Sequence, residues 1–292
     1  MATLRQILAG LALGVLLAGC SAADALNMLV PSDGYNQYSA LPYGTDARQV
    51  LDVYEPKAPA PAGGRTVVVF FYGGSWRGGE RETYQFVAEA LTSKGYLTII
   101  PDYRVFPQAV YPAFVDDAAH ALRWAVDNAA RYGGNKDRVV LMGHSAGAHI
   151  AALTALDPQF LKNVDLPTTA VKGFVGLAGP YSFDPLEFKV TRAVFGYLKD
   201  PQVTRPVLYA ENASAPMLLL HGDDDTTVGP YNAIDMAAAL RQAGKPVTLT
   251  IYKGVAHIGI VLAMAAPFRS RAPTLNDSAA FIDSLFVSRA AE

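Results

Sequence analysis

Hydrophobic positions along the chain alternate between continuous runs and helical spacing. Residues 65–74 (RTVVVFFYGG) are almost continuously β-branched or aromatic, which is typical of a strand buried on both faces. Residues 114–134 instead carry apolar side chains at helical spacing and end in a double glycine, which predicts a helix and its stop. By the same criteria, strands are predicted over 48–56, 65–74, 96–104, 137–145, 171–179, 215–225 and 246–254. Helices are predicted over 82–95, 114–134, 146–156, 231–244 and 276–289.

Strands that alternate with helices of these lengths favour a mostly parallel sheet with helices on both faces, the α/β class. The chain has 292 residues, of which 51% are hydrophobic, so one large core is well supplied. We therefore expect a single α/β domain over 48–292, in which 48–56 is an edge strand. Residues 181–212 are irregular with weak helical patterning and lie between two predicted strands, where they are expected to form a small cap.

The N-terminal segment has the layout of an export signal. Arg5 is followed by an apolar stretch of about a dozen residues and then by small residues, which is short for a membrane span. Residues 17–20 (LAGC) resemble the bacterial lipobox, in which the cysteine is lipidated and becomes the new N-terminus, and Cys20 is the only cysteine. We expect a signal peptide over 1–19 and a tether and irregular lead-in over 20–47. The resemblance implies an exported protein anchored to a bacterial membrane through Cys20, on the periplasmic or cell-surface side. An ordinary signal peptide or an uncleaved anchor is the alternative.

Charge excludes one class of partner. The formal net charge is -2 and the sequence has no basic cluster, so it offers no positively charged surface that would attract the phosphates of nucleic acid. No metal site and no cofactor is predicted. The sequence leaves the oligomeric state open.

Candidate chemistry begins at residues 143–147 (GHSAG), which separate the strand predicted over 137–145 from the helix predicted over 146–156. A serine on such a turn is a nucleophile elbow when glycines two positions before and after it remove side-chain clashes. Gly143 and Gly147 meet this requirement. Ser145 is thus the predicted nucleophile, and the alternative is a serine in a structural turn.

A serine nucleophile needs a base, and the chain offers five histidines, at 120, 144, 149, 221 and 257. His120 and His149 lie within helical patterns, and His144 lies on the turn itself. His221 ends a strand, where it can orient the following loop. His257 follows the last predicted strand in what we expect to be a loop at the carboxyl edge of the sheet, so it is the predicted base.

The base needs a carboxylate that fixes its tautomer. Asp223, Asp224 and Asp225 follow the strand predicted over 215–225, and their position alone does not choose among them. Calcium binding by these adjacent carboxylates is a minor alternative, because they lack the alternating spacing of a calcium loop.

Negative charge that develops on a carbonyl oxygen needs backbone N–H donors. One predicted donor is Ala146, directly after the nucleophile. Gly73 and Gly74 follow a buried strand and let the bare backbone approach a substrate, so they are the other predicted donors. Nearby aromatic residues are candidates for an apolar pocket or for core packing: Tyr72, Trp76, Phe106, Phe183 and Phe195.

These motifs (FYGGSW, PDYR, GHSAGAH, HGDDDTTV and YKGVAHIG) together resemble the α/β-hydrolase superfamily over about residues 48–288. They are most similar to the esterase/lipase branch that includes hormone-sensitive-lipase-like carboxylesterases and arylformamidases. The resemblance implies Asp225 as the acid, because the family's acid follows the histidine–glycine pair after two residues. It also implies Ser145 and His257 as nucleophile and base, and Gly73 and Gly74 in the oxyanion hole. Tyr72 departs from the family, which usually has histidine there.

The expected function is a serine carboxylesterase that cleaves short-chain or aryl esters through an acyl-enzyme. An arylformamidase-type amidase acting on N-formylkynurenine-like substrates shares every motif, although an export signal argues against it. A catalytically silent, surface-tethered binding protein is a third possibility. A prolyl-oligopeptidase-type peptidase needs a large additional domain that does not fit in the chain.

Overall fold

The computed structural model describes residues 26–27 and 30–287. The signal peptide predicted over 1–19 and the lipidation site Cys20 lie outside the described residues. Within them, no helix is long and apolar enough to span a bilayer.

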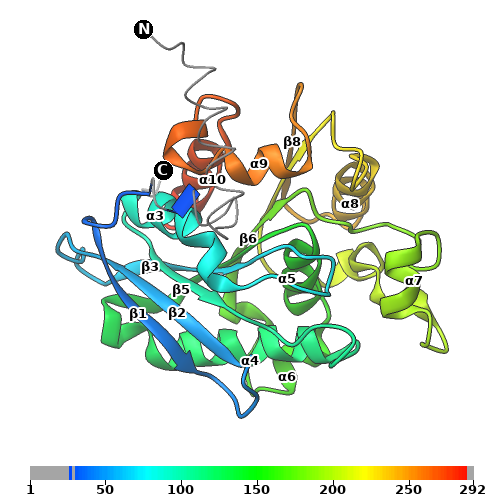
Figure 1. Ribbon diagram of the computed structural model, residues 1–292, viewed down its shortest axis with the longest axis horizontal. Coiled ribbons are helices and arrows are strands. Elements are labelled where there is room, and N and C mark those ends of the chain that lie inside the picture. Colours follow the sequence, from blue (N-terminus) through cyan, green and yellow to red (C-terminus); the bar gives the residue numbers. More distant parts are fainter. Residues whose placement is uncertain (1–25, 28–29, 288–292) are drawn as a thin grey trace, which may run out of the picture.

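One eight-stranded sheet runs through the molecule in the order β1-β2-β4-β3-β5-β6-β7-β8 (Figure 1). Its strands are β1 (Tyr35–Pro42), β2 (Val50–Pro56), β3 (Arg65–Phe71), β4 (Leu97–Pro101), β5 (Gly134–His144), β6 (Val171–Leu177), β7 (Met217–Gly222) and β8 (Val247–Tyr252). The β1–β2 and β2–β4 pairs are antiparallel, and all other neighbours are parallel. The predicted α/β class with a mostly parallel sheet is confirmed.

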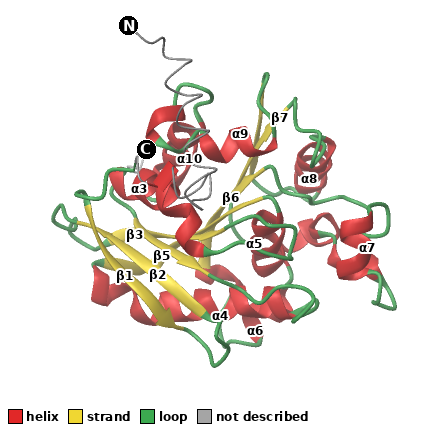
Figure 2. Cartoon of the chain, in the orientation of Figure 1, coloured by secondary structure: helices red, strands yellow, loops and turns green. Residues whose placement is uncertain are grey.

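Helices cover both faces of the sheet (Figure 2). They are α3 (Gln85–Ser93), α4 (Ala113–Asn128), α5 (Ala146–Leu156), α6 (Pro158–Lys162), α7 (Lys189–Phe195), α8 (Tyr231–Gln242), α9 (His257–Leu262) and α10 (Thr274–Ser284). Helices α3 and α10 pack together on one face, whereas α4, α5 and α6 pack together on the other. Parallel strands need cover on both faces because both are apolar, and all seven residues of β3 are buried.

Helices α4 and α5 lie on the same face of the sheet but differ in how much of their surface is buried. Helix α4 buries Phe114, Val115, Ala118, Leu122 and Ala125, spaced as one apolar stripe. Helix α5 is buried nearly all round, and its small residues let it lie close to β5 and α4. Helix α5 begins directly after the predicted nucleophile, so the close packing of this helix also fixes the position of Ser145.

Three expectations about the elements change. Residues 35–42 form strand β1, so the irregular lead-in predicted over 20–47 is wrong there and 48–56 is not the edge of the sheet. Most side chains of β1 are exposed, and its sequence therefore lacks an apolar signal. His257 begins helix α9 and does not lie in a loop.

The insertion predicted over 181–212 contains α7 and two 3-10 helices, η4 (Pro201–Thr204) and η5 (Pro206–Asn212). Helix α7 lies at the right edge of the view in Figure 1. Although the segment is irregular, Phe195 and Thr204 are fully buried. It is therefore packed onto the domain at these points.

Candidate active site

Ser145 stands between β5 and α5 in a backbone conformation that L-residues rarely adopt, with φ 55° and ψ -126°. The flanking glycines permit this turn. A Cβ added at Gly143 would lie 2.5 Å from the Gly147 carbonyl oxygen, and one added at Gly147 would lie 2.1 Å from the Phe71 carbonyl oxygen. Since neither position can hold a side chain, the turn matches the predicted nucleophile elbow.

The structure brings Ser145, His257 and Asp225 together from three separate segments. His257 Nε2 lies 2.9 Å from Ser145 Oγ, and His257 Nδ1 lies 2.7 Å from Asp225 Oδ2. A carboxylate only accepts hydrogen bonds, so Nδ1 donates and Nε2 is left to accept the serine proton. The other two aspartates have no such role: Asp223 accepts the Gly254 N–H, and Asp224 is exposed.

Asp225 is held as a carboxylate by its surroundings. Its Oδ1 accepts the N–H groups of Thr227 (2.9 Å) and Val228 (2.8 Å). Burial alone would raise the pKa of Asp225, but hydrogen bonds from His221, His257 and the Val228 backbone bring it below its usual range. The carboxylate therefore stays ionised throughout the range in which a histidine base works.

Two further histidines support the three residues. His221 Nε2 lies 2.7 Å from the Val228 carbonyl oxygen and 3.2 Å from Asp225 Oδ2, as expected for a residue that orients the acid loop. His144 Nε2 lies 3.0 Å from the carbonyl oxygen of His257, and it must carry the hydrogen because a carbonyl cannot donate. Burial, together with the nearby His257, lowers the pKa of His144 to about 3. His144 is therefore a neutral link between the elbow and the start of α9.

Residues 73–76 form a tight loop, hereafter the 73–76 loop, beside the serine. A Cβ added at Gly73 would lie 3.0 Å from the Ser145 Cβ, a tight contact that glycine avoids. Gly73 itself is buried. Gly74 and Ser75 are exposed residues, and their N–H groups bond to no backbone carbonyl of the described residues. Ser75 was not predicted from the sequence, because only the glycines signalled a close approach.

Tyr72, at the position where the resembled family has histidine, ties this loop to the neighbouring strand. Its hydroxyl donates to Asp102 Oδ1 (2.7 Å) and accepts from Arg48 (2.9 Å), while the Tyr103 hydroxyl donates to the Tyr72 carbonyl oxygen (2.8 Å). Arg81 forms an ion pair with Asp102 at 2.6 Å. The tyrosine is thus anchored from both its side chain and its backbone.

The other aromatic candidates fall into two groups. Trp76, Phe183 and Phe195 are buried and pack against one another. Phe106 is only partly buried and lies under the Arg77 guanidinium at 5.3 Å. The first group is core packing, whereas Phe106 is more exposed to solvent.

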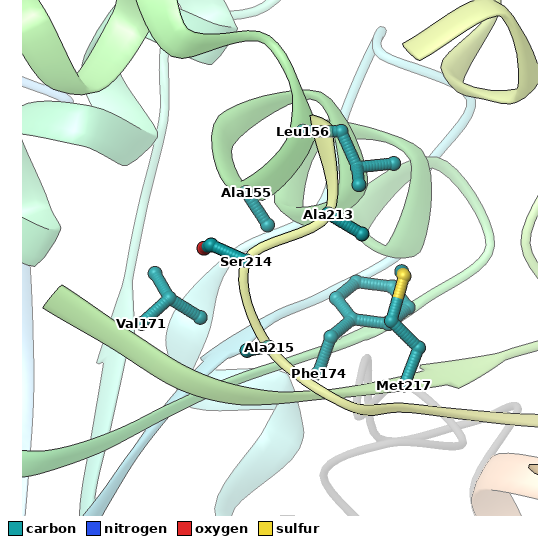
Figure 3. Close-up of a pocket in the computed structure, with 8 residues that line it drawn as sticks. All are labelled: Ala155, Leu156, Val171, Phe174, Ala213, Ser214, Ala215 and Met217. Atoms are coloured by element: carbon teal, nitrogen blue, oxygen red, sulfur yellow. The ribbon is translucent and has the colours of Figure 1, made fainter. Parts of the chain in front are cut away.

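Two pockets lie away from these residues. The first has a volume of about 10 Å³, enough for about one water, and is lined by small or apolar residues that include Ala155, Phe174 and Met217 (Figure 3). It lies at the C-terminal end of α5, whereas Ser145 precedes its N-terminus. The second, about 530 Å³, is lined by residues of η5 and α8. Neither contains a residue of the Ser145 site, and no cluster of three or more potential metal ligands occurs among the described residues.

A family model named BD-FAE matches residues 51–240, more than half of the chain. The chain belongs to the BD-FAE family. Among curated relatives, a probable isoprenylcysteine alpha-carbonyl methylesterase from Oryza sativa subsp. japonica is 30% identical over 75% of this chain. Esterase LipQ from Mycobacterium tuberculosis is 29% identical over 82% of this chain. The matches span 58% and 61% of those relatives, so this BD-FAE member covers well under two thirds of their length.

Solved structures share the fold of this BD-FAE member. Esterase B from Lactobacillus rhamnosis aligns with a TM-score of 0.77 at 17% identity, over 97% of this chain and 94% of its own. A truncated carbohydrate esterase from gut microbiota aligns with a TM-score of 0.74 at 18% identity, over 88% of this chain and 98% of its own. These likenesses, together with the strand order, show the α/β-hydrolase fold.

Proposed function

We propose that this protein is a serine carboxylesterase that hydrolyses short-chain or aryl esters through an acyl-enzyme. The observation that carries the proposal is the continuous relay from Ser145 Oγ through His257 to Asp225, with distances of 2.9 and 2.7 Å. The relay stands on a strained turn at the carboxyl end of a central strand. That edge of an open parallel sheet is where ligands bind.

The geometry gives each residue one task. Ser145 Oγ attacks the ester carbonyl carbon while its proton passes to His257 Nε2, and Asp225 stabilises the resulting imidazolium through Nδ1–H. His257 then returns the proton to the departing alkoxide, which leaves as an alcohol with the acyl group bonded to Ser145. Water gives its proton to His257 and attacks the acyl carbon. The acid is released and the proton returns to Ser145.

The carbonyl oxygen becomes an oxyanion in both halves of this cycle. The N–H of Ala146 is the first of helix α5, so it has no acceptor within the helix. The further donors that we propose are the N–H groups of Gly74 and Ser75, which bond to no backbone carbonyl in the described part of the chain. Such donors, fixed before the reaction, are typically worth about 3 kcal/mol each in the transition state. Gly73 leaves room for Ser145, and its role as a donor stays a prediction.

Family membership and the names of the relatives support ester hydrolysis over other serine chemistry. Ser145 is buried, and this limited access favours small or flat acyl groups. The test compares initial rates on p-nitrophenyl acetate, butyrate, octanoate and N-formylkynurenine, with Ser145→Ala alongside. We expect the acetate or butyrate to be cleaved fastest and no turnover in the variant. Faster cleavage of the formamide would contradict the proposal and indicate an amidase.

We also propose that the chain is exported and lipid-anchored at Cys20, as its lipobox-like residues 17–20 suggest. The test is to express the wild-type chain and the Cys20→Ser variant in a bacterium and to compare their intact masses by mass spectrometry. A mass that starts at residue 20 and includes acyl groups, absent from the variant, is expected. An unmodified or unprocessed chain would contradict this proposal and leave the esterase assignment untouched.

A further inference from the structure

His149 is a buried histidine that the proposed mechanism does not use. It lies in the first turn of helix α5, where its backbone N–H bonds the Ser145 carbonyl oxygen at 3.1 Å. Its ring has no solvent exposure and both of its nitrogens have partners. Nδ1 lies 3.1 Å from the indole Nε1 of Trp76, and Nε2 lies 2.7 Å from the carbonyl oxygen of Thr204.

These partners fix the state of the ring. An indole N–H only donates, so Nδ1 must accept, and a carbonyl only accepts, so Nε2 must donate. His149 is consequently neutral and in one tautomer. Burial lowers the pKa of His149 to about 4, although the Thr204 carbonyl acts in the opposite direction, and the ring keeps this state at neutral pH.

Trp76 belongs to the 73–76 loop, whose backbone is unfavourable for its own residues. The Arg77 N–H bonds the Gly74 carbonyl oxygen at 2.9 Å, which closes a turn around Ser75 and Trp76. Both central residues have positive φ, 53° and 58°, a combination that usually requires asparagine and glycine. Serine and tryptophan do not favour this turn, so contacts elsewhere must hold it.

The side chain of Trp76 supplies those contacts. Its ring is 4% exposed and meets the rings of His149, Phe183 and Phe195 at centroid distances of 5.0, 5.9 and 4.9 Å. Its indole nitrogen makes its hydrogen bond to His149 alone among the described side chains. Phe183, Phe195 and Thr204 belong to the 181–212 insertion. His149 is therefore the point at which the nucleophile helix, the 73–76 loop and the insertion meet.

We infer that His149 is a positioning residue for ester hydrolysis, which acts by holding Trp76 and thereby the N–H groups of Gly74 and Ser75 in place for the oxyanion. The inference rests on the proposed function. His149 touches no reacting atom, and its ring is one helical turn away from the nucleophile. Loss of its bond to Trp76 leaves Ser145, His257 and Asp225 in place. The same loss removes a contact that holds the turn around Ser75 and Trp76.

The test is a double-mutant cycle on p-nitrophenyl acetate hydrolysis with His149→Phe, Trp76→Phe and the double variant. Phenylalanine keeps a ring at each position but removes the hydrogen bond. We expect each single variant to lose at least about 10-fold in kcat with KM changed less than about threefold, since the oxyanion forms only after binding. The double variant is expected to be no slower than the slower single variant, because both changes break the same bond. His120→Phe, an exposed position on α4, is the matched control and is expected to keep the wild-type rate.

A kcat of His149→Phe within threefold of the wild type would overturn the inference, as would losses that multiply in the double variant. Thermal melting of each variant shows whether it is folded. If His149→Phe does not fold, Trp76→Phe decides by the same split between kcat and KM. His149→Gln keeps an acceptor and a donor, so it is expected to retain more of the wild-type kcat than Trp76→Phe. Absence of ester turnover by the wild type would instead remove the proposed function, so the two failures are distinguishable.

Discussion

Acid should destabilise this fold through its buried histidines, and His149 allows the size of the effect to be worked out. Burial lowers the pKa of His149 to about 4 in the folded chain, although its bond to Thr204 acts in the opposite direction. The usual histidine pKa is about 6.5 in an unfolded chain. Between these values the unfolded chain binds a proton and the folded chain does not. Stability is therefore lost as pH falls from about 6.5 toward 4, and this histidine causes no change above pH 7.

Each pH unit in this window costs about 1.36 kcal/mol, so His149 alone lowers the free energy of unfolding by about 2 to 3 kcal/mol at pH 4.5. That loss is a large share of the roughly 5 to 15 kcal/mol that stabilises a typical domain. His144, whose pKa burial lowers to about 3, acts in the same direction.

The assay is urea unfolding at pH 7.5 and 4.5, followed by fluorescence of the chain's two tryptophans, for the wild type and His149→Gln. The variant should be less stable at pH 7.5 but should lose about 2 kcal/mol less than the wild type on acidification. Thr154→Val is the matched control, since it removes a buried hydroxyl of the same helix that does not titrate. The difference in free energy of unfolding between Thr154→Val and the wild type should be equal at both pH values. If the difference for His149→Gln were also the same at both pH values, the reasoning would be refuted.

Three further substitutions test the site and the core. Asp225→Asn should lower kcat on p-nitrophenyl acetate by about 10³- to 10⁴-fold, because His257 loses the partner that fixes its tautomer. The circular dichroism spectrum should be unchanged, and a loss of kcat below tenfold would contradict this role. Tyr72→Phe removes a hydroxyl that contacts Asp102 and Arg48 and should lower the free energy of unfolding by about 1 to 3 kcal/mol in urea titrations; unchanged stability would show that the hydroxyl is dispensable. Met217→Ala, at the pocket in Figure 3, should cost about 2 to 5 kcal/mol in the same titration, because the side chain is buried and its truncation enlarges a cavity. A cost below 1 kcal/mol would indicate that the surrounding residues collapse into the space.

The sequence was most informative where one local signal determined the structure. Continuous apolar runs predicted the buried strands because a parallel sheet excludes water from both faces. Strand β1 had no such signal, since it lies at the edge of the sheet with most of its side chains exposed. Its pairing with β2 is a tertiary property.

The site shows the same division. The glycines around Ser145 have a steric reason that the sequence contains, whereas the choice of Asp225 among three adjacent aspartates depended on a family resemblance. The contacts of His149 also escaped the sequence pattern, because Trp76 and Thr204 are distant in the chain and meet it only after folding.

The most direct test of the central claim is covalent labelling with a fluorophosphonate, followed by peptide mass spectrometry to locate the modified residue. The wild type should lose p-nitrophenyl acetate hydrolysis in step with labelling, at one site, Ser145. Ser145→Ala should neither label nor turn over. Labelling at another serine, or hydrolysis that persists in the folded Ser145→Ala variant, would contradict the assignment of Ser145, His257 and Asp225 as the active site.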